Sequence, residues 1–518
     1  MNHNIRVLIV ALATIGSLAG CAESELVIPD PTYPVETNQV LLEASKLEHV
    51  EDGVYGNIYL PQEINGQKVK WVSSHPNIIN VEGTDKMAPG IVTRRKRDVE
   101  VRLTAVYGTD ESNYTQYTQT VKVKAAPKKL QDKDFKAYLF GHFVGESYGK
   151  NNSVATGEQI FFALADVGQG LHFKDMNKST MSNLKPVLSS KVGEKGVRDP
   201  YICRSPEGDT FYLIATDLSV YTRGGWNNNA NQATKTGSHS ITLWESHDLV
   251  HWTDARLIEV ARKDAGMAWA PEMIYCEETG EYLIFFSSTI LDEESAELAP
   301  SKRTNAKIIY RDSVYYTTTR DFVHFGETKQ FIPNVAYDAK TTSRNESDEF
   351  ALNNDFRKVI DGSVMKIGDW YYSACKDGGN NEDGGGIRIQ KTQNLYDGQW
   401  EFVQNLADVG YKVESRTADN KCLEGPEWFY LNQADRKDPK VPEIGLMADF
   451  YANTSIGYIP FATTNVEDIK NANKSWRLLK SGAKKDFTWD KQTKRHGTIL
   501  RITADEAKRL KDAFPIKS

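Results

Sequence analysis

Carboxylates recur in short, similar segments between residues 198 and 426, and their arrangement points to acid–base chemistry. Each stands where a turn meets an apolar stretch, in the segments Arg198-Asp199-Pro200, Trp269-Ala270-Pro271-Glu272, Ile360-Asp361-Gly362 and Leu423-Glu424-Gly425-Pro426. Like charges that fold into one place push each other's pKa values apart. One protonated and one ionised carboxyl are what the hydrolysis of a glycosidic bond requires. Taken singly, each acid could instead be a solvated turn residue or a calcium ligand.

A repeat over residues 130–518 predicts how these acids are brought together. An aromatic residue that follows an Asp or Asn and an apolar residue recurs roughly every 75 residues, at Phe173, Trp252, Phe325, Trp400 and Trp476. An apolar strand–turn–strand pattern precedes each. Five such units of about four short strands predict an all-β, five-bladed β-propeller, because one blade is too small to bury its faces alone.

The same repeat predicts where the acids lie. In a propeller the first strand of each blade lines the central channel, so the four strand starts should deliver one acid each to about the same height of one mouth. A late strand over residues 496–502 is expected to close the ring against the first blade.

The region before the repeat has a different pattern. Alternating apolar and polar residues at 68–72, 99–106 and 118–123 predict a small β-sandwich over residues 39–127. The segments 71–76 and 90–93 resemble bacterial Ig-like modules. The module could be a spacer or could bind carbohydrate, and residues 21–38, which contain three prolines, are expected to be a tether.

The first twenty residues predict a secretory signal. A polar start that contains Arg6 is followed by an apolar core of about a dozen residues and by small residues. The run Leu18-Ala19-Gly20-Cys21 resembles the bacterial lipobox, which implies lipidation of Cys21 and a bacterial outer-membrane location, facing the periplasm or the cell surface. An ordinary signal peptide is the alternative.

The composition limits the function classes. The chain is 40% hydrophobic and 26% charged with a net charge of −7, which argues against disorder and against a nucleic-acid binder. No second apolar stretch could meet a bilayer, so a transporter is excluded and contact with a membrane is expected only through the lipid anchor. The other cysteines, Cys203, Cys276, Cys375 and Cys422, form no CxxC pair and read as buried thiols rather than zinc ligands, while disulfides stay open.

The four acidic segments, in this order and with these spacings, resemble glycoside hydrolase family 43 over roughly residues 135–505. The resemblance implies a five-bladed propeller that hydrolyses arabinosides or xylosides with inversion of configuration. It implies that Asp199 is the general base, that Glu424 is the general acid, and that Asp361 orients Glu424 and raises its pKa. Asp361-Gly362 departs from the Asp-Pro of many members.

Other residues are weaker candidates. Trp269 could form an apolar wall for a sugar, and Glu272 and Arg388 could reach substrate, although core packing or a structural charge would explain each. His496 resembles a histidine near the channel axis of family members that helps to hold water or a calcium ion. The acidic loop over residues 378–386 lacks the ligand spacing of an EF-hand. The chemistry requires no cofactor, and a structural calcium ion in the channel is left open.

Two classes of function therefore stand. The first is an inverting, exo-acting α-L-arabinofuranosidase that acts on side chains of plant-type polysaccharides, with β-xylosidase as the alternative of the same family. The second is a non-catalytic propeller that binds glycans at a surface. Because Asp199, Asp361 and Glu424 are all present, the sequence favours the enzyme.

Overall fold

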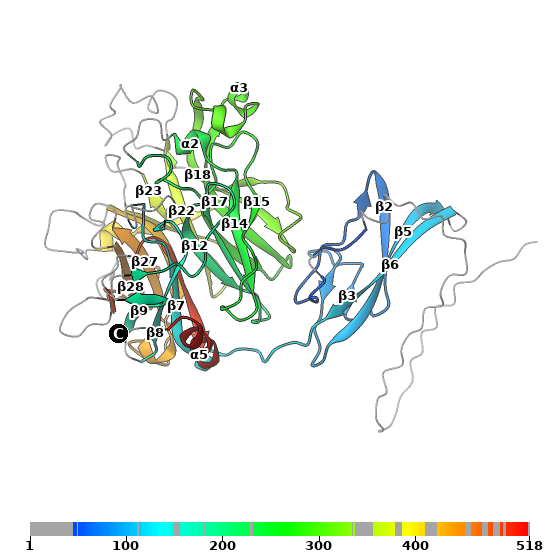
Figure 1. Ribbon diagram of the computed structural model, residues 1–518, viewed down its shortest axis with the longest axis horizontal. Helices are drawn as coiled ribbons and strands as arrows, with labels where there is room; N and C mark the ends of the chain where they lie inside the picture. Colours follow the sequence, from blue (N-terminus) through cyan, green and yellow to red (C-terminus); the bar gives the residue numbers. More distant parts are fainter. Residues whose placement is uncertain are drawn as a thin grey trace, which may run out of the picture.

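The computed structural model describes residues 45–515 with gaps at 49, 111–112, 147, 149–155, 169, 181–182, 227–231, 334, 337–355, 379–385, 410–421, 451–456, 469–474, 480–486 and 491–493. Figure 1 shows a small β unit (blue) joined by an extended segment to a larger β domain. The predicted signal segment, Cys21 and nearly all of the acidic loop lie outside the described residues. No helix among the residues that are described is long and apolar enough to cross a membrane.

The small unit is built on one antiparallel sheet in the order β1-β2-β5-β6, with strands β1 (Glu63–Ile64), β2 (Gln67–Ser73), β5 (Val99–Asp110) and β6 (Asn113–Val123). A two-stranded sheet of β3 (Ile79–Asn80) and β4 (Ile91–Val92) accompanies it. Alternation places Val69 and Trp71 of β2 in a core with Leu103 and Tyr107 of β5. The Ig-like assignment and its boundaries stay a prediction.

The larger domain is a five-bladed β-propeller, which confirms the predicted fold. Four blades are four-stranded antiparallel sheets whose strands follow one another in the chain. Blade 2 is β12 (Val197–Arg204), β13 (Phe211–Asp217), β14 (Ser240–Ser246) and β15 (Arg256–Glu259). Blade 3 is β16 (Trp269–Cys276), β17 (Glu281–Leu291), β18 (Ile308–Thr319) and β19 (Lys329–Ile332).

Blades 4 and 5 repeat this plan. Blade 4 is β22 (Val359–Ile367), β23 (Trp370–Asp377), β24 (Ile387–Thr392) and β25 (Glu401–Asn405). Blade 5 is β26 (Leu423–Tyr430), β27 (Ile444–Phe450), β28 (Gly457–Thr463) and β29 (Trp476–Leu478). Apolar side chains pack between neighbouring blades, as Leu243 of blade 2 does in one cluster with Met273 and Ile284 of blade 3.

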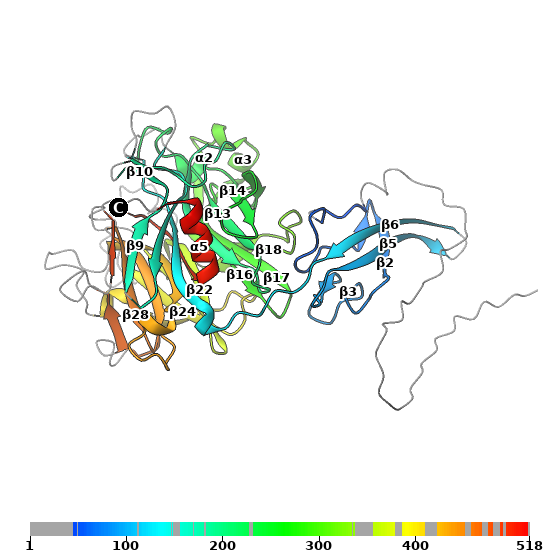
Figure 2. The same ribbon diagram turned by 60° about the horizontal axis from the view of Figure 1, so that its bottom comes forward.

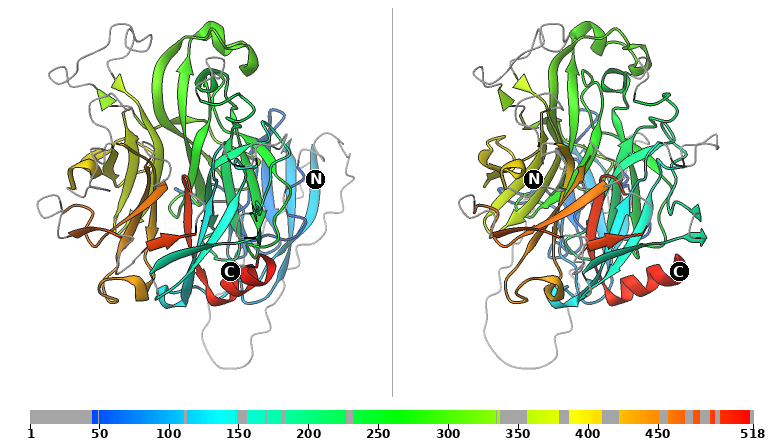
Figure 3. Two further views of the ribbon diagram at one scale, coloured as in Figure 1. Left: turned by 60° about the vertical axis from the view of Figure 1, so that its left-hand side comes forward. Right: turned by 90° about the vertical axis from the view of Figure 1, so that its left-hand side faces the viewer.

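Blade 1 joins the two ends of the propeller segment. It has the order β30-β9-β8-β7-β31, with β7 (Phe135–His142), β8 (Phe161–Asp166), β9 (Leu171–Asp175), β30 (Phe487–Trp489) and β31 (Gly497–Thr503). The predicted closing strand is confirmed, because β31 (red) pairs antiparallel with β7 (cyan), as Figure 3 shows. β31 also contacts β12 and β26, so it completes an inner ring with β12, β16, β22 and β26.

Helices are few and short. Helix α5 (Ala504–Ala513) follows β31 and packs on β7, as Figure 2 shows. It begins at a capping box in which Thr503 and Glu506 bond each other's backbone N–H groups, a signal the sequence contains. The remaining short elements are α2 (Ala233–Thr236), α3 (Glu293–Ala296), β10 (Lys178–Thr180), β11 (Asn183–Leu184), β20 (Val335–Ala336), β21 (Phe356–Arg357), and 3₁₀ turns at Asp132–Asp134, Pro300–Lys302, Leu406–Val409 and Gln433–Asp435.

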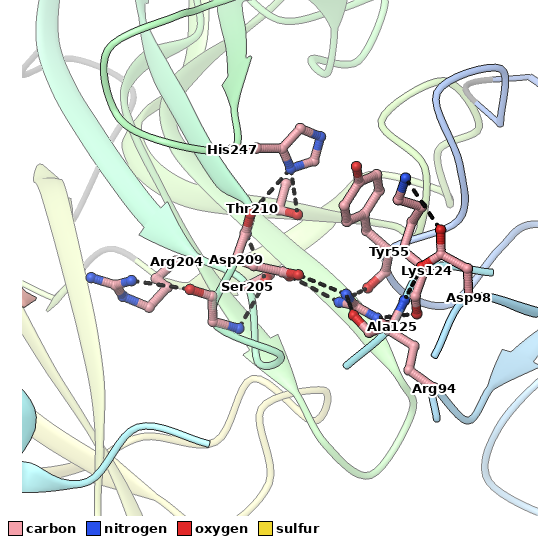
Figure 4. Close-up of polar contacts among 11 residues, drawn as sticks. Tyr55, Arg94, Asp98, Lys124, Ala125, Arg204, Ser205, Asp209, Thr210 and His247 are labelled. Atoms are coloured by element: carbon pink, nitrogen blue, oxygen red, sulfur yellow. Dashed lines mark hydrogen bonds and ion pairs between the residues drawn. The ribbon is translucent and has the colours of Figure 1, made fainter. Parts of the chain in front are cut away.

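The small unit is clamped to blade 2 by a guanidinium. Arg94 donates to both carboxylate oxygens of Asp209, at 2.9 and 2.6 Å, and to the backbone oxygens of Tyr55 and Lys124 (Figure 4). The ring of Tyr55 stacks on His247 with 4.0 Å between centroids. A cavity of about 470 Å³ lies along this seam, at the ends of β12 and β16 that are remote from Asp199.

Candidate active site

Four inner strands carry the same irregularity near their starts. The pairing with the next strand shifts between Arg198 and Tyr201, between Trp269 and Glu272, between Ile360 and Ser363, and between Glu424 and Glu427. The first residue inside each bulge has a positive φ: Asp199 (48°), Ala270 (46°), Asp361 (55°) and Gly425 (54°). This conformation costs a non-glycine residue free energy. Because the same bulge recurs in four blades, the propeller fold sets the direction of the chain at the start of each inner strand, which is the mouth of the channel.

The bulges correct the expectation that four acids stand at about the same height. Asp199 and Asp361 occupy the same position in their bulges, whereas Glu424 precedes its bulge and Glu272 follows one. Glu272 is instead equivalent to Glu427. An alignment on the second residue of each bulge, which is Pro200, Pro271, Gly362 or Pro426, shows this shift, whereas an alignment on the acids does not.

Asp199 is held in the mouth by a hydroxyl. Thr216 Oγ1 donates to Asp199 Oδ2 at 2.9 Å and itself accepts from the backbone N–H of Ala270 at 2.7 Å. His496 Nδ1 lies 3.6 Å from the other carboxylate oxygen, Oδ1. The single hydroxyl hydrogen of Thr216 is thus directed at Asp199, which orients this carboxyl at the mouth.

Asp361 connects three blades. Its backbone N–H donates to Ser287 Oγ of blade 3 at 2.9 Å, and its Oδ2 accepts from the backbone N–H of Gly425 in blade 5 at 3.1 Å. Desolvation and the negative charges of Glu424 and Asp199 raise the pKa of Asp361 to about 6, although His496 and Lys376 act against this shift. The mutual influence of these three carboxyls places them in one electrostatic cluster.

Glu424 lies between two cations. Lys376 Nζ is 2.6 Å from its Oε2, and Arg495 Nη2 is 3.4 Å from its Oε1. Arg495 also holds Asp449, through Nε, at 2.5 Å. Desolvation pushes the pKa of Glu424 upward, but Lys376 and Arg495 outweigh it, so that the pKa lies below its ordinary value. The net pKa of Glu424 is thus set by its two cations, and the expected upward contribution of Asp361 stays a prediction.

Glu272 and Glu427 form a second pair of carboxyls deeper in the channel. Glu272 is only 3% exposed, and its Oε2 has no hydrogen-bond partner among the described residues. Thr498 donates to Glu427 at 2.9 Å. Burial and repulsion by Glu427 raise the pKa of Glu272 well above its ordinary value, and burial raises that of Glu427 to about 7. Glu272 thus lies below the mouth, and its contact with substrate stays a prediction.

Two indoles lie together near Arg198, the neighbour of Asp199 in the chain. Trp226 is 49% exposed and meets Trp269 edge to face, with 5.9 Å between ring centroids. The guanidinium of Arg198 lies 5.4 Å from the Trp226 ring and 4.4 Å from that of Phe143. Trp269 packs on the small apolar cluster of Leu218, Val220 and Ala233. Of these two indoles, the more exposed one is Trp226, which no motif in the sequence singles out.

Arg388 does not meet the three carboxylates through its described contacts. It lies on β24, the third strand of blade 4, where Nη1 is 3.7 Å from Asp377 Oδ2 and the guanidinium is 4.4 Å from the Phe402 ring. Its role toward substrate stays a prediction. The four cysteines are free thiols, of which Cys276 and Cys375 are buried and Cys203 and Cys422 are partly so.

The sequence leaves open a calcium ion in the channel. Within the described part of the chain, no three His, Cys, Asp or Glu side chains are placed to hold a metal ion. His496 lies beside Asp199 and at 6.1 Å from the Tyr458 ring. Calcium bound through this histidine stays a prediction.

Several residues of the mouth are absent from the sequence-based prediction. Thr216, Ser287, Lys376 and Asp449 all pair with the residue just before a bulge, on the second strand of their blades. An alignment of the blades to one another, rather than of the acids alone, would have found this position. Glu427 could also be predicted from the sequence, because Pro426-Glu427 repeats the Pro271-Glu272 of blade 3.

A protein-family model and a curated protein are similar to this chain. The family model described as "Probable glycosyl hydrolase domain", related to glycosyl hydrolase family 43, matches residues 133–508. An α-L-arabinofuranosidase of Bifidobacterium longum subsp. longum is 29% identical over 437 residues, which cover 78% of this chain and 36% of that protein. The chain thus spans little more than a third of the length of this curated relative.

Solved structures of similar fold were also found. An arabinanase of Bacillus subtilis is 15% identical with a TM-score of 0.32, covering 57% of this chain and 83% of that one. An α-L-arabinofuranosidase of Lactobacillus brevis is 16% identical with a TM-score of 0.35, covering 57% and 74%. The family match extends over nearly the whole propeller, and from it we conclude that this chain belongs to the glycosyl hydrolases related to family 43.

Proposed function

We propose that the protein is an inverting, exo-acting α-L-arabinofuranosidase that removes terminal arabinose from the side chains of plant-type polysaccharides. The observation that carries the proposal is the cluster of Asp199, Asp361 and Glu424, delivered to one mouth by three different blades. The name of the Bifidobacterium relative supports the choice of arabinose. β-Xylosidase is the alternative within the same chemistry, and it would use the same three carboxyls.

In the mechanism, Asp199 acts as a base and Glu424 acts as an acid. Asp199, which accepts from Thr216, takes a proton from a water as the water oxygen bonds to the anomeric carbon. Glu424, once protonated, gives its proton to the glycosidic oxygen as the bond to the anomeric carbon breaks. The products are a sugar with inverted configuration and the free hydroxyl of the remaining glycan. Asp361 contacts neither reacting atom in this scheme and acts by charge on Glu424.

The first experiment separates the candidate functions. The purified protein is incubated with an aryl α-L-arabinofuranoside and an aryl β-xyloside, and the anomer formed first is followed by proton NMR. Release of arabinose with inverted configuration is expected. Release of xylose would favour the alternative enzyme, and retention of configuration would show that Asp199 has the wrong role. Glycan binding without turnover of either substrate would favour a non-catalytic propeller.

A further inference from the structure

One position of the propeller changes its residue type from blade to blade. In blades 2 and 3 the residue opposite the strand start is Thr216 or Ser287, whose hydroxyl accepts the N–H of the next blade's bulge. These bonds reach Ala270 at 2.7 Å and Asp361 at 2.9 Å. The hydroxyl is thus the ordinary link between one blade and the next at the mouth.

Blade 4 has Lys376 at the equivalent position, where it pairs with Ile360. A lysine ammonium has only donors and cannot accept the N–H of the next bulge. That N–H, from Gly425, donates to Asp361 Oδ2 instead, at 3.1 Å. Because Lys376 cannot accept this N–H, the carboxyl of Asp361 links blades 4 and 5. Lys376 instead places a positive charge at the mouth.

Lys376 forms a close ion pair with Glu424. Its Nζ lies 2.6 Å from Glu424 Oε2, and the residue is only 7% exposed, so water screens the pair weakly. Arg495 and His496, just before β31, also act on Glu424, and Glu424 interacts with Asp361 of β22 and Asp449 of β27. Asp199 of β12 acts on Asp361 and Arg495. Arg495 is shared with Asp449, whereas the ion pair of Lys376 Nζ is with Glu424.

We propose that Lys376 is a positioning residue that orients Glu424 and sets the highest pH at which this acid can donate a proton. The inference rests on the proposed role of Glu424 as general acid. An ammonium at this distance favours the carboxylate over the carboxylic acid. Because only the protonated form can assist the leaving group, the lysine confines turnover to the acidic side of neutrality.

The test replaces Lys376 with the residue that blade 2 uses. Lys376→Thr restores a hydroxyl that can accept the Gly425 N–H and removes the charge, whereas Lys376→Arg keeps the charge. Lys391→Met serves as the matched control, because Lys391 of the same blade pairs with Glu467 away from the mouth, at 3.0 Å. The pH dependence of kcat/KM is measured on an aryl glycoside with a poor leaving group, and folding is checked by circular dichroism.

Removal of the cation raises the pKa of Glu424, so the protonated acid persists to higher pH. The basic limb of the profile should move upward by about one pH unit or more in Lys376→Thr and stay in place in Lys376→Arg and Lys391→Met. A limb that stays in place in Lys376→Thr, or that moves equally in Lys391→Met, overturns the proposal.

A second readout needs no activity. In protein labelled with ¹³C at the glutamate carboxyl, the resonance that disappears in Glu424→Gln belongs to Glu424, and its titration can be followed directly. Its pKa should rise in Lys376→Thr by the amount that the basic limb moves. If that pKa rises in a protein with no turnover of any glycoside, the proposed function fails, and only the effect of Lys376 on the ionisation of Glu424 stands. If it does not rise, the inference fails whatever the activity.

Discussion

At the scale of single residues, Asp199 and Glu424 have different partners and should respond differently to removal. Asp199→Ala should lower kcat by roughly 10²- to 10⁴-fold on every glycoside, because activation of water is always required. Glu424→Ala should lower kcat by a similar factor only with poor leaving groups, because a good leaving group departs without a proton. Kinetics on a series of aryl glycosides checks this, with circular dichroism as the folding control. Equal losses across the series for Glu424→Ala would contradict its role as acid.

Asp361 should shift the pKa of Glu424 in the direction opposite to the shift that Lys376 causes. Asp361 has a pKa of about 6, so above that pH its negative charge disfavours ionisation of Glu424. Asp361→Asn removes this repulsion, the pKa of Glu424 falls, and the basic limb of the kcat/KM profile should move to lower pH. The profile is measured beside that of Lys376→Thr, which should move upward. An unmoved limb in Asp361→Asn would mean that Asp361 does not act by charge.

At the scale of elements, the bulge of β26 depends on a glycine. A Cβ on Gly425 would stand 2.6 Å from Cγ of His496, and its φ of 54° is strained for other residues. Gly425→Ala should therefore displace His496 from Asp199, lower kcat/KM at least tenfold, and lower the free energy of unfolding by about 1–3 kcal/mol. Activity assays and urea denaturation measure the two effects.

Gly368 provides the matched control. It also has a positive φ, 61°, but a Cβ there would meet nothing within 4 Å. Gly368→Ala should thus carry only the backbone cost of about 1 kcal/mol and keep wild-type activity. Similar losses of activity in both variants would show that strain, rather than contact with His496, is responsible.

The elements also show what sequence can and cannot predict. The blades, the strand starts that carry Asp199, Asp361 and Glu424, and the closing strand can be predicted, because apolar periodicity and turn residues are local signals. The bulges cannot, so the burial of Glu272 and the register of Glu424 differ from expectation. Lys376 and Arg495 escape prediction for another reason: their importance comes from contacts between blades that are distant in sequence.

At the scale of the whole molecule, we propose that the chain is anchored by a lipid on Cys21. A thioether-linked lipid requires the thiol, and two or three acyl chains are enough for stable membrane attachment. Cys21→Ser should therefore appear in the soluble fraction, whereas the wild-type protein stays with the membranes. Fractionation and immunoblotting test this, with Cys422→Ser as the control thiol. Equal retention of Cys21→Ser would contradict lipid anchoring.

The small unit and the propeller meet through a seam with buried charge. The side chain of Arg94 is almost fully buried where it holds Asp209, and a buried ion pair is costly to break because each charge would be left unpaired. The same seam brings the aromatic ring of Tyr59 onto His324, at 4.1 Å between centroids. These contacts predict that the two units move as one body and not independently.

The place of β31 in the ring has a consequence for synthesis of the protein. Every other strand of the inner ring precedes it in the chain, yet β31 lies between β12 and β26 and is preceded directly by Arg495 and His496. On the ribosome, Asp199 and Glu424 are therefore translated before Arg495 and His496, which lie against them in the folded protein. A nascent chain carries a ring with one inner strand missing, and the mouth is assembled only when that last segment has emerged.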